Sequence, residues 1–143
     1  MKTDPGPVSI EERHRTLLIL WFAICMSLTI MYFAFIYLAT VTPAPNPKLT
    51  LLLNTVGLIP VAASFLIKQI LLEKAVTAQQ MQQVHSAYVI SFALCEVSGL
   101  LALLDYRLTG SKYYYLGFAI GGIGLLLHFP RKQHLVDASS PRI

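Results

Sequence analysis

Apolar residues are concentrated in four blocks along the chain, and short polar stretches separate them. The blocks cover about residues 16–38, 48–72, 84–104 and 113–129. Each has about 17 to 25 residues, which is the length that a helix needs to cross a bilayer. We therefore predict an all-α polytopic membrane protein, in which residues 1–143 form a single integral membrane domain with four transmembrane helices.

The first two connections carry local signals for helix boundaries. Residues 1–15 form a polar N-terminal arm, in which Ser9 and Glu12 have the spacing of a capping box, so a short helix is expected to begin near Ser9. Three prolines between residues 43 and 47 predict a non-helical loop, because proline cannot donate a backbone hydrogen bond. Pro60, inside the second block, is expected to kink its helix.

The later connections differ in whether they contain a glycine or proline that would end a helix. The polar stretch 73–83 contains no glycine or proline, so it is expected to continue both flanking helices as a helical hairpin extension. A short polar turn is predicted at residues 105–112, with Gly110 as the helix breaker. The polar tail, residues 130–143, is expected to be irregular.

The composition agrees with a membrane location, since 55% of the residues are hydrophobic and 13% are charged. The basic residues lie at the ends of the apolar blocks, so we predict no nucleic-acid partner despite the net charge of +4. They are more frequent on the side that would hold both termini and the middle loop, which predicts cytoplasmic termini in a bacterial-type inner membrane. That side would carry Lys2, Arg13, Arg15, Lys68, Lys74, Arg131, Lys132 and Arg142, and the opposite side would carry Lys48, Arg107 and Lys112.

The third block has two distinct faces when it is drawn as a helix. Glu96, an acid near the middle of the block, lies roughly opposite a stripe of small residues. We expect the stripe to pack inside the bundle and Glu96 to point toward lipid or another subunit. Glu96 would then either carry a proton or small ion, or form a structural hydrogen bond with Asn54, Ser64 or a tyrosine. The small residues are Ala87, Ser91, Cys95, Ser98 and Ala102.

The fourth block and the histidines offer further candidates. Gly117, Gly121 and Gly124 share one face and include a GxxxG pair, which predicts close packing against another helix. His85 and His128 both lie near the cytoplasmic ends of their blocks, where they could ligate haem or a chlorophyll-type pigment. The alternative is an interfacial histidine that bonds to headgroups or backbone. This alternative is favoured, so no cofactor is predicted.

The sequence has no motif for metal binding, covalent haem attachment, nucleophilic catalysis or phosphate binding. Cys25 and Cys95 belong to no CxxC pair and are expected to pack as small apolar residues. We therefore predict that the protein is not an enzyme and holds no metal.

Residues 93–103 read Ala-Leu-Cys-Glu-Val-Ser-Gly-Leu-Leu-Ala-Leu. This segment resembles the carboxylate-bearing helix of the proteolipid, or c, subunit of rotary ATPases, which has alanine and leucine before the glutamate and a glycine–leucine pair after it. The resemblance implies a protonatable, outward-facing Glu96. It extends over this segment alone, since the second block has only Gly57 where the family has a glycine-rich helix, and the family's Arg-Gln-Pro loop is missing.

Three functions are consistent with these features. We expect a small non-catalytic accessory subunit of a larger, energy-converting membrane complex, with the bilayer and other membrane-protein subunits as its partners. The first alternative is proton or small-ion handling through Glu96. The second is a haem- or pigment-binding bundle that uses His85 and His128.

Overall fold

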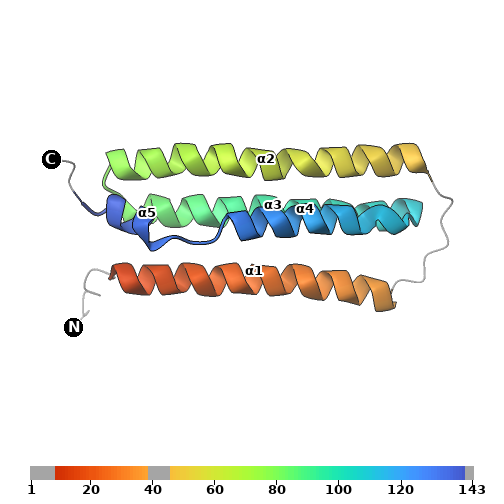
Figure 1. Cartoon of the computed structure of the whole chain (residues 1–143), viewed down its shortest axis with the longest axis horizontal. Coiled ribbons are helices and arrows are strands. Elements are labelled where there is room, and N and C mark those ends of the chain that lie inside the picture. The colour runs from red at the N-terminus through yellow and green to blue at the C-terminus, as the bar shows by residue number, and fades with distance from the viewer. Residues whose placement is uncertain (1–8, 39–45, 141–143) are drawn as a thin grey trace, which may run out of the picture.

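The computed structural model describes residues 9–38 and 46–140, which are helical along most of their length (Figure 1). Within these residues no β-strand occurs, so the all-α prediction is confirmed. The long helices are α1 (Ile10–Leu38), α2 (Pro47–Thr77) and α3 (Met81–Thr109). They are followed by a 3-10 turn, η1 (Lys112–Tyr114), and by the shorter helices α4 (Tyr115–Leu127) and α5 (Lys132–Asp137).

Three of these helices, α1, α2 and α3, are long and apolar enough to cross a membrane. They correspond to the first three predicted spans, each extended at one or both ends. The fourth apolar segment, Lys112–Leu127, is a shorter helix.

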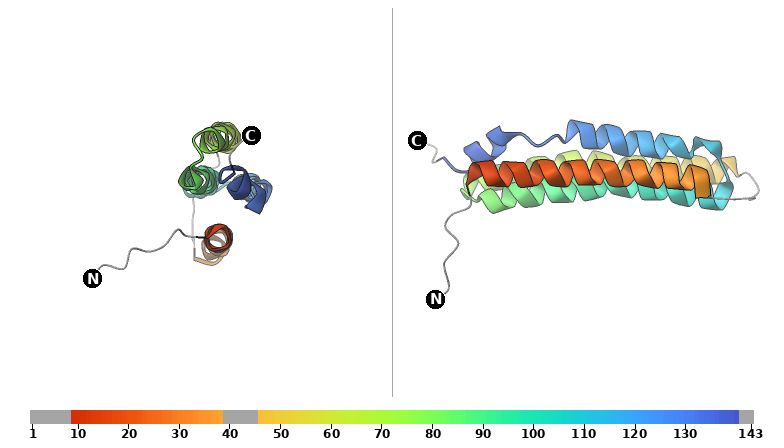
Figure 2. Two further views of the ribbon diagram at one scale, coloured as in Figure 1. Left: turned by 90° about the vertical axis from the view of Figure 1, so that its left-hand side faces the viewer. Right: turned by 90° about the horizontal axis from the view of Figure 1, so that it is seen from below.

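The helices run roughly parallel or antiparallel to one another (Figure 2). Among the three long helices, α3 is the most buried. In the end-on view, α1 and α2 lie on opposite sides of the layer formed by α3 and α4. Small residues allow α3 to approach α2 and α4 closely, whereas α1 presents much of its apolar surface outward. Other helices therefore cover more than one side of α3.

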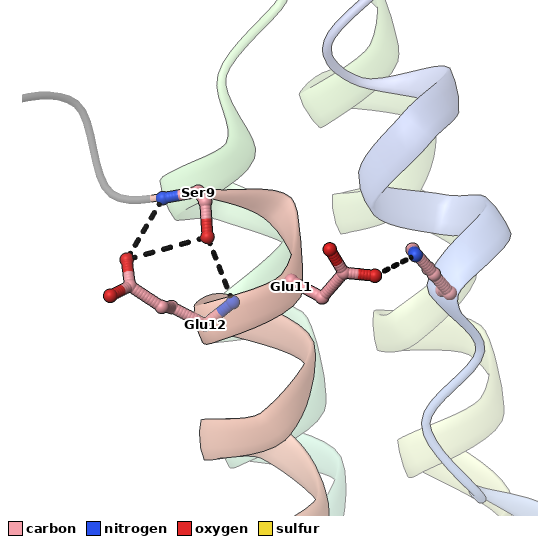
Figure 3. Close-up of polar contacts among 4 residues, drawn as sticks. Ser9, Glu11 and Glu12 are labelled. Carbon is pink, nitrogen blue, oxygen red and sulfur yellow. Dashed lines mark hydrogen bonds and ion pairs between the residues drawn. The ribbon is translucent and has the colours of Figure 1, made fainter.

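The start of α1, the α2–α3 turn and α5 all lie at one end of the bundle (Figure 1). Two side-chain contacts join these parts. Arg13 Nη1 donates to Gln82 Oε1 at 3.0 Å, and Lys132 Nζ pairs with Glu11 Oε1 at 2.6 Å (Figure 3). We call this the α5 end of the bundle, and the opposite end the η1 end.

Several helix boundaries fall where local chemistry predicts them. Ser9 and Glu12 form the capping box, since the Glu12 N–H donates to Ser9 Oγ and the Ser9 N–H donates to Glu12 Oε2 (Figure 3). The helix that begins there is α1 itself rather than a separate short helix. Gly110 ends α3 in the left-handed conformation, with a φ of 60°.

The structure of the α2–α3 region agrees in part with the sequence predictions. The helices α2 and α3 continue through the polar stretch 73–83 and are joined by only Ala78–Gln80, as a helical hairpin requires. The proline-rich loop is predicted over residues 42–47, of which 42–45 lie outside the described residues, and Pro47 is the first residue of α2. The helix α2 passes through Pro60 as one continuous element.

Two sequence predictions about connections are wrong. The polar turn does not begin at Asp105, because α3 continues to Thr109 and buries the Asp105 side chain. The tail is not irregular throughout, because residues 132–137 form α5. This helix packs against the bundle through Leu135, and Ala138, just beyond its end, is also buried. A polar tail can become ordered when a few apolar residues dock it in this way.

Candidate functional site: polar side chains inside the helical bundle

Glu96 contacts α1, and its side chain is half-buried. Its Oε1 accepts a hydrogen bond from Ser27 Oγ at 3.0 Å. The two partners that the sequence suggested, Asn54 and Ser64, bond to other residues, and contact of the exposed part of Glu96 with lipid or another subunit stays a prediction. The helical wheel correctly places Glu96 opposite the small-residue stripe, but α1 covers part of that face.

The predicted packing residues meet at the centre of the bundle. All five residues of the stripe are buried in the interior, as are Gly117, Gly121 and Gly124 of α4. A Cβ atom added to Gly121 would lie 2.7 Å from the Cys95 carbonyl oxygen, and one added to Gly117 would lie 2.7 Å from the Ala102 Cβ. The backbones of α3 and α4 are in such close contact that only glycine fits at these positions. The stripe comprises Ala87, Ser91, Cys95, Ser98 and Ala102.

His128 is buried in the interior of the bundle. Its side chain is fully buried, and its Nε2 lies 2.7 Å from Ser64 Oγ, which itself donates to the Val61 carbonyl. The ring also packs edge-on against Phe65, and Cys95 lies 3.8 Å from the same hydroxyl. The histidine thus bonds to a side chain of α2, not to headgroups or backbone as expected. The other candidate, His85, is half-buried on α3, and binding of haem or pigment by this pair stays a prediction.

The chain between α4 and α5 is not helical, and side chains of other helices contact its backbone. His14 Nε2 donates to the Pro130 carbonyl at 3.3 Å, and the Arg131 N–H donates to Tyr88 Oη at 3.0 Å. In the last turn of α4, Trp21 Nε1 donates to the Leu125 carbonyl at 2.8 Å. Protein groups therefore satisfy backbone groups both at the end of α4 and in the non-helical connection.

Tyr88 also anchors α5, which the sequence reasoning missed. Its hydroxyl oxygen accepts from the Arg131 N–H and lies 2.7 Å from His134 Nδ1, which accepts the hydroxyl proton in the tautomer that carries its hydrogen on Nε2. The Lys68 Nζ atom lies 4.2 Å from the centre of the Tyr88 ring. Burial lowers the pKa of His134 below its ordinary value of 6.5, and the positive charges of Lys68 and Arg131 lower it further, against an opposing effect of Asp137.

A second polar cluster lies at the η1 end, between α2 and α3. Asp105 is fully buried there, and its Oδ1 accepts from Thr109 Oγ1 at 3.0 Å while its Oδ2 accepts from Asn54 Nδ2 at 3.3 Å. Thr50 Oγ1 donates to Thr109 Oγ1 at 3.1 Å. We call Thr50, Asn54, Asp105 and Thr109 the Asp105 cluster. A signal for it was present in the sequence, because each helix contributes two polar residues four positions apart.

Comparisons with known proteins do not add to this description. No family model, no curated protein and no solved structure matches the chain. Within the described residues, no group of three or more histidine, cysteine, aspartate or glutamate side chains is placed to hold a metal ion.

Proposed function

We propose that this chain is a non-catalytic accessory subunit of a larger membrane complex, and that Glu96 lies where a partner subunit covers α1 and α3. The observation that carries the proposal is the half-buried state of this carboxyl group near the middle of a helix that is apolar enough to span a bilayer. Ser27 donates to one of its oxygens, Oε1. A carboxyl group at that depth needs further polar partners, since hydrocarbon supplies none.

The exposed surface of α1, the helix that bonds to Glu96, is also suited to contact with a partner. The helix α1 has an extensive exposed apolar surface, and the α1–α4 boundary contains a groove of about 490 Å³. Cys25, Leu28 and Phe118 are among the residues that line this groove. In a bilayer these surfaces meet either lipid or protein, and only a protein partner also supplies hydrogen-bonding groups to Glu96 at that depth. The exposed residues of α1 include Ile19, Phe22, Met26, Ile30 and Phe33.

The proposal is tested by replacing Glu96 with glutamine and, separately, with leucine. Wild-type protein extracted in mild detergent should migrate well above its own mass of 15.9 kDa on a native gel. Glu96→Gln should keep this assembly, because the amide still offers hydrogen-bonding groups, whereas Glu96→Leu should lose most of it. Leu66→Ala, at an exposed apolar position of α2, which lies on the opposite side of the bundle from α1, is the control and should leave the assembly intact. A wild-type protein that migrates as a monomer, or a Glu96→Leu variant that assembles normally, would contradict the proposal.

Proton handling through Glu96 is the second candidate function. It is favoured by the nature of the partner, since the Ser27 hydroxyl can donate to an ionised carboxylate and accept from a protonated one. In that case both Glu96 variants should abolish proton uptake by reconstituted vesicles while the assembly on the native gel is unchanged.

We further propose four membrane crossings with both termini in the cytoplasm. The shorter fourth segment gains length from its flanks. At standard rises, η1, α4 with the turn at His128, and the non-helical residues 129–131 together span roughly 35 Å, which exceeds the thickness of the hydrocarbon core. The satisfied backbone between α4 and α5 is what a crossing of this kind requires.

The orientation follows from the excess of basic residues at the α5 end. Two reporter proteins are needed, one that is active only in the cytoplasm and one that is active only after export. The cytoplasmic reporter should be active when it is fused after Ile143 or after Gln80. The export-dependent reporter should be active when it is inserted after Gly110. A C-terminal fusion that is exported would refute the fourth crossing or the orientation, and the Gln80 fusion distinguishes the two, since it is exported only if the orientation is reversed.

A further inference from the structure

We propose that Lys68 and Arg131 bind the phosphate group of an anionic phospholipid at the α5 end of the bundle. Tyr88, on α3, brings these two residues together. The Lys68 Nζ atom lies 4.2 Å from the centre of the Tyr88 ring, and the hydroxyl of the same ring accepts from the Arg131 N–H at 3.0 Å. A basic residue of α2 and the basic residue just before α5 are therefore held against one tyrosine.

Neither of these cations has an acidic partner in the part of the chain that the structure describes. The one ion pair found there joins Lys132 to Glu11 (Figure 3). Arg131 bonds to Tyr88 through its backbone, so its guanidinium group is free to bind an anion. The ring face attracts the Lys68 ammonium group but does not neutralise its charge. Two neighbouring positive charges repel each other, and an anion between them removes this repulsion.

The electrostatics of His134 indicate that both charges act on the same place. Burial lowers the pKa of His134, and the positive charges of Lys68 and Arg131 lower it further. Asp137 has the opposite effect on this pKa, but its carboxylate accepts from the Gln133 amide at 2.8 Å and pairs with neither cation. The charge around Tyr88 is therefore positive on balance, which complements a phosphate group.

Both cations can be reached from outside the bundle. Arg131 is exposed, and Lys68 is half-buried. Among the described residues, the buried side-chain nitrogen atoms that lack a partner belong to Arg13 and His128, so the Lys68 Nζ atom is not itself buried. The two groups that would bind phosphate are thus neither occupied by other protein groups nor closed off from a headgroup.

The surroundings of the two cations favour a lipid over a soluble anion. Lys68 lies within the apolar length of α2, and a lysine in such a position turns its charge toward the membrane surface. Phe65, one turn nearer to the middle of α2, is 40% exposed and packs edge-on against His128, while Leu127 beside that histidine is 63% exposed. A phospholipid can place its acyl chains against these apolar side chains and its phosphate at the cations. Basic sites between membrane helices on the cytoplasmic side bind anionic headgroups in this way.

The test is the thermal unfolding of the whole chain in detergent, at constant ionic strength, with phosphatidylglycerol or phosphatidylcholine of identical acyl chains. At about one hundred times its dissociation constant, phosphatidylglycerol should raise the unfolding midpoint by about 5–10 °C relative to phosphatidylcholine. Inorganic phosphate should have a much smaller effect, because it has no acyl chains. Lys68→Gln and Arg131→Gln should each weaken phosphatidylglycerol binding about fivefold, whereas Lys68→Arg should keep it. Arg107→Gln, which removes an exposed positive charge at the other end of α3, is the matched control and should leave binding unchanged.

Native mass spectrometry keeps the test decisive if a variant does not fold, since wild-type protein should retain phosphatidylglycerol in preference to phosphatidylcholine. Equal midpoints in the two lipids, or an unchanged response in both Lys68→Gln and Arg131→Gln, would overturn the proposal. Equal stabilisation by inorganic phosphate would also overturn it, because the site would then take a free anion. So would loss of assembly on the native gel in Lys68→Gln without any lipid response, since the cations would then pair with an acidic partner protein. The lipid response does not depend on Glu96, so its failure is distinct from failure of the proposed subunit contact.

Discussion

Replacing Gly121 with alanine should destabilise the bundle by about 1–3 kcal/mol, the usual cost of forcing an extra methyl group into a packed interior. The added Cβ would lie 2.7 Å from the Cys95 carbonyl oxygen, which is a backbone atom of α3 and cannot rotate away. The helix α4 would have to move away from α3, and contacts along the α3–α4 interface would weaken together.

The neighbouring glycine provides a matched control. A Cβ added to Gly122 meets no atom within 4 Å, so Gly122→Ala should be neutral or stabilising by up to about 1 kcal/mol through the higher helix propensity of alanine. Both variants can be unfolded in detergent and followed by fluorescence. Trp21 is the only tryptophan of the chain and contacts the end of α4, through the Leu125 carbonyl and the Phe129 ring. Equal destabilisation by the two changes would show that α3 and α4 do not approach as closely as described.

Acidification should release α5 from the bundle. The pKa of His134 is lower in the folded protein than its ordinary value of 6.5, so below that pH the unfolded segment binds protons that the docked segment does not. The contribution of His134 to docking is therefore complete above pH 6.5 and is lost as the pH falls toward the lower pKa of the folded state. Protonation also converts Nδ1, which accepts from Tyr88, into a donor.

Hydrogen exchange of the α5 amides between pH 7.5 and 5 measures this release. After correction for intrinsic rates, exchange over residues 132–137 should accelerate as the pH falls, while exchange in α3 should not. His134→Asn keeps a neutral acceptor near the Nδ1 position and should remove the pH dependence. Tyr88→Phe, which removes the contacts to both Arg131 and His134, should already release α5 at pH 7.5. Protection of α5 that is constant over this pH range would rule out His134 as the cause.

The features that depend on short-range chemistry were predictable from the sequence. The capping box at Ser9, the left-handed Gly110 and the apolar length of three helices are each determined by residues within a few positions of one another. The glycine and small-residue faces were also predicted, because helical periodicity alone brings them together.

The direction of Glu96 was not predictable in the same way. A helical wheel gives the angle between two faces of a helix, but it does not say how many neighbours that helix has. The helix α3 packs against α2 and α4 through its small residues and against α1 through the face that bears Glu96. A central helix has no single outer face, and only the position of α1 reveals this.

Polar residues near helix ends were the other source of error. Asp105 was taken as the start of a turn because its neighbours toward Lys112 are polar, yet its partner on α2, Asn54, lies more than fifty residues away in the chain. His134 was overlooked for a similar reason, since its partner Tyr88 is on α3. The spacing of polar residues within one helix is visible in the sequence, but the residue of another helix that each of them meets is not.

The placement of α1 has a consequence for how the chain is made. Although α2 follows it directly, α1 packs against α3, α4 and α5, and the Trp21 N–H finds its acceptor 104 residues later, at Leu125. During synthesis α1 therefore enters the bilayer long before the residues that bond to Ser27, Trp21 and His14 have left the ribosome. The α2–α3 hairpin can close from local contacts alone, and α1 joins it only when the C-terminal quarter of the chain has been delivered.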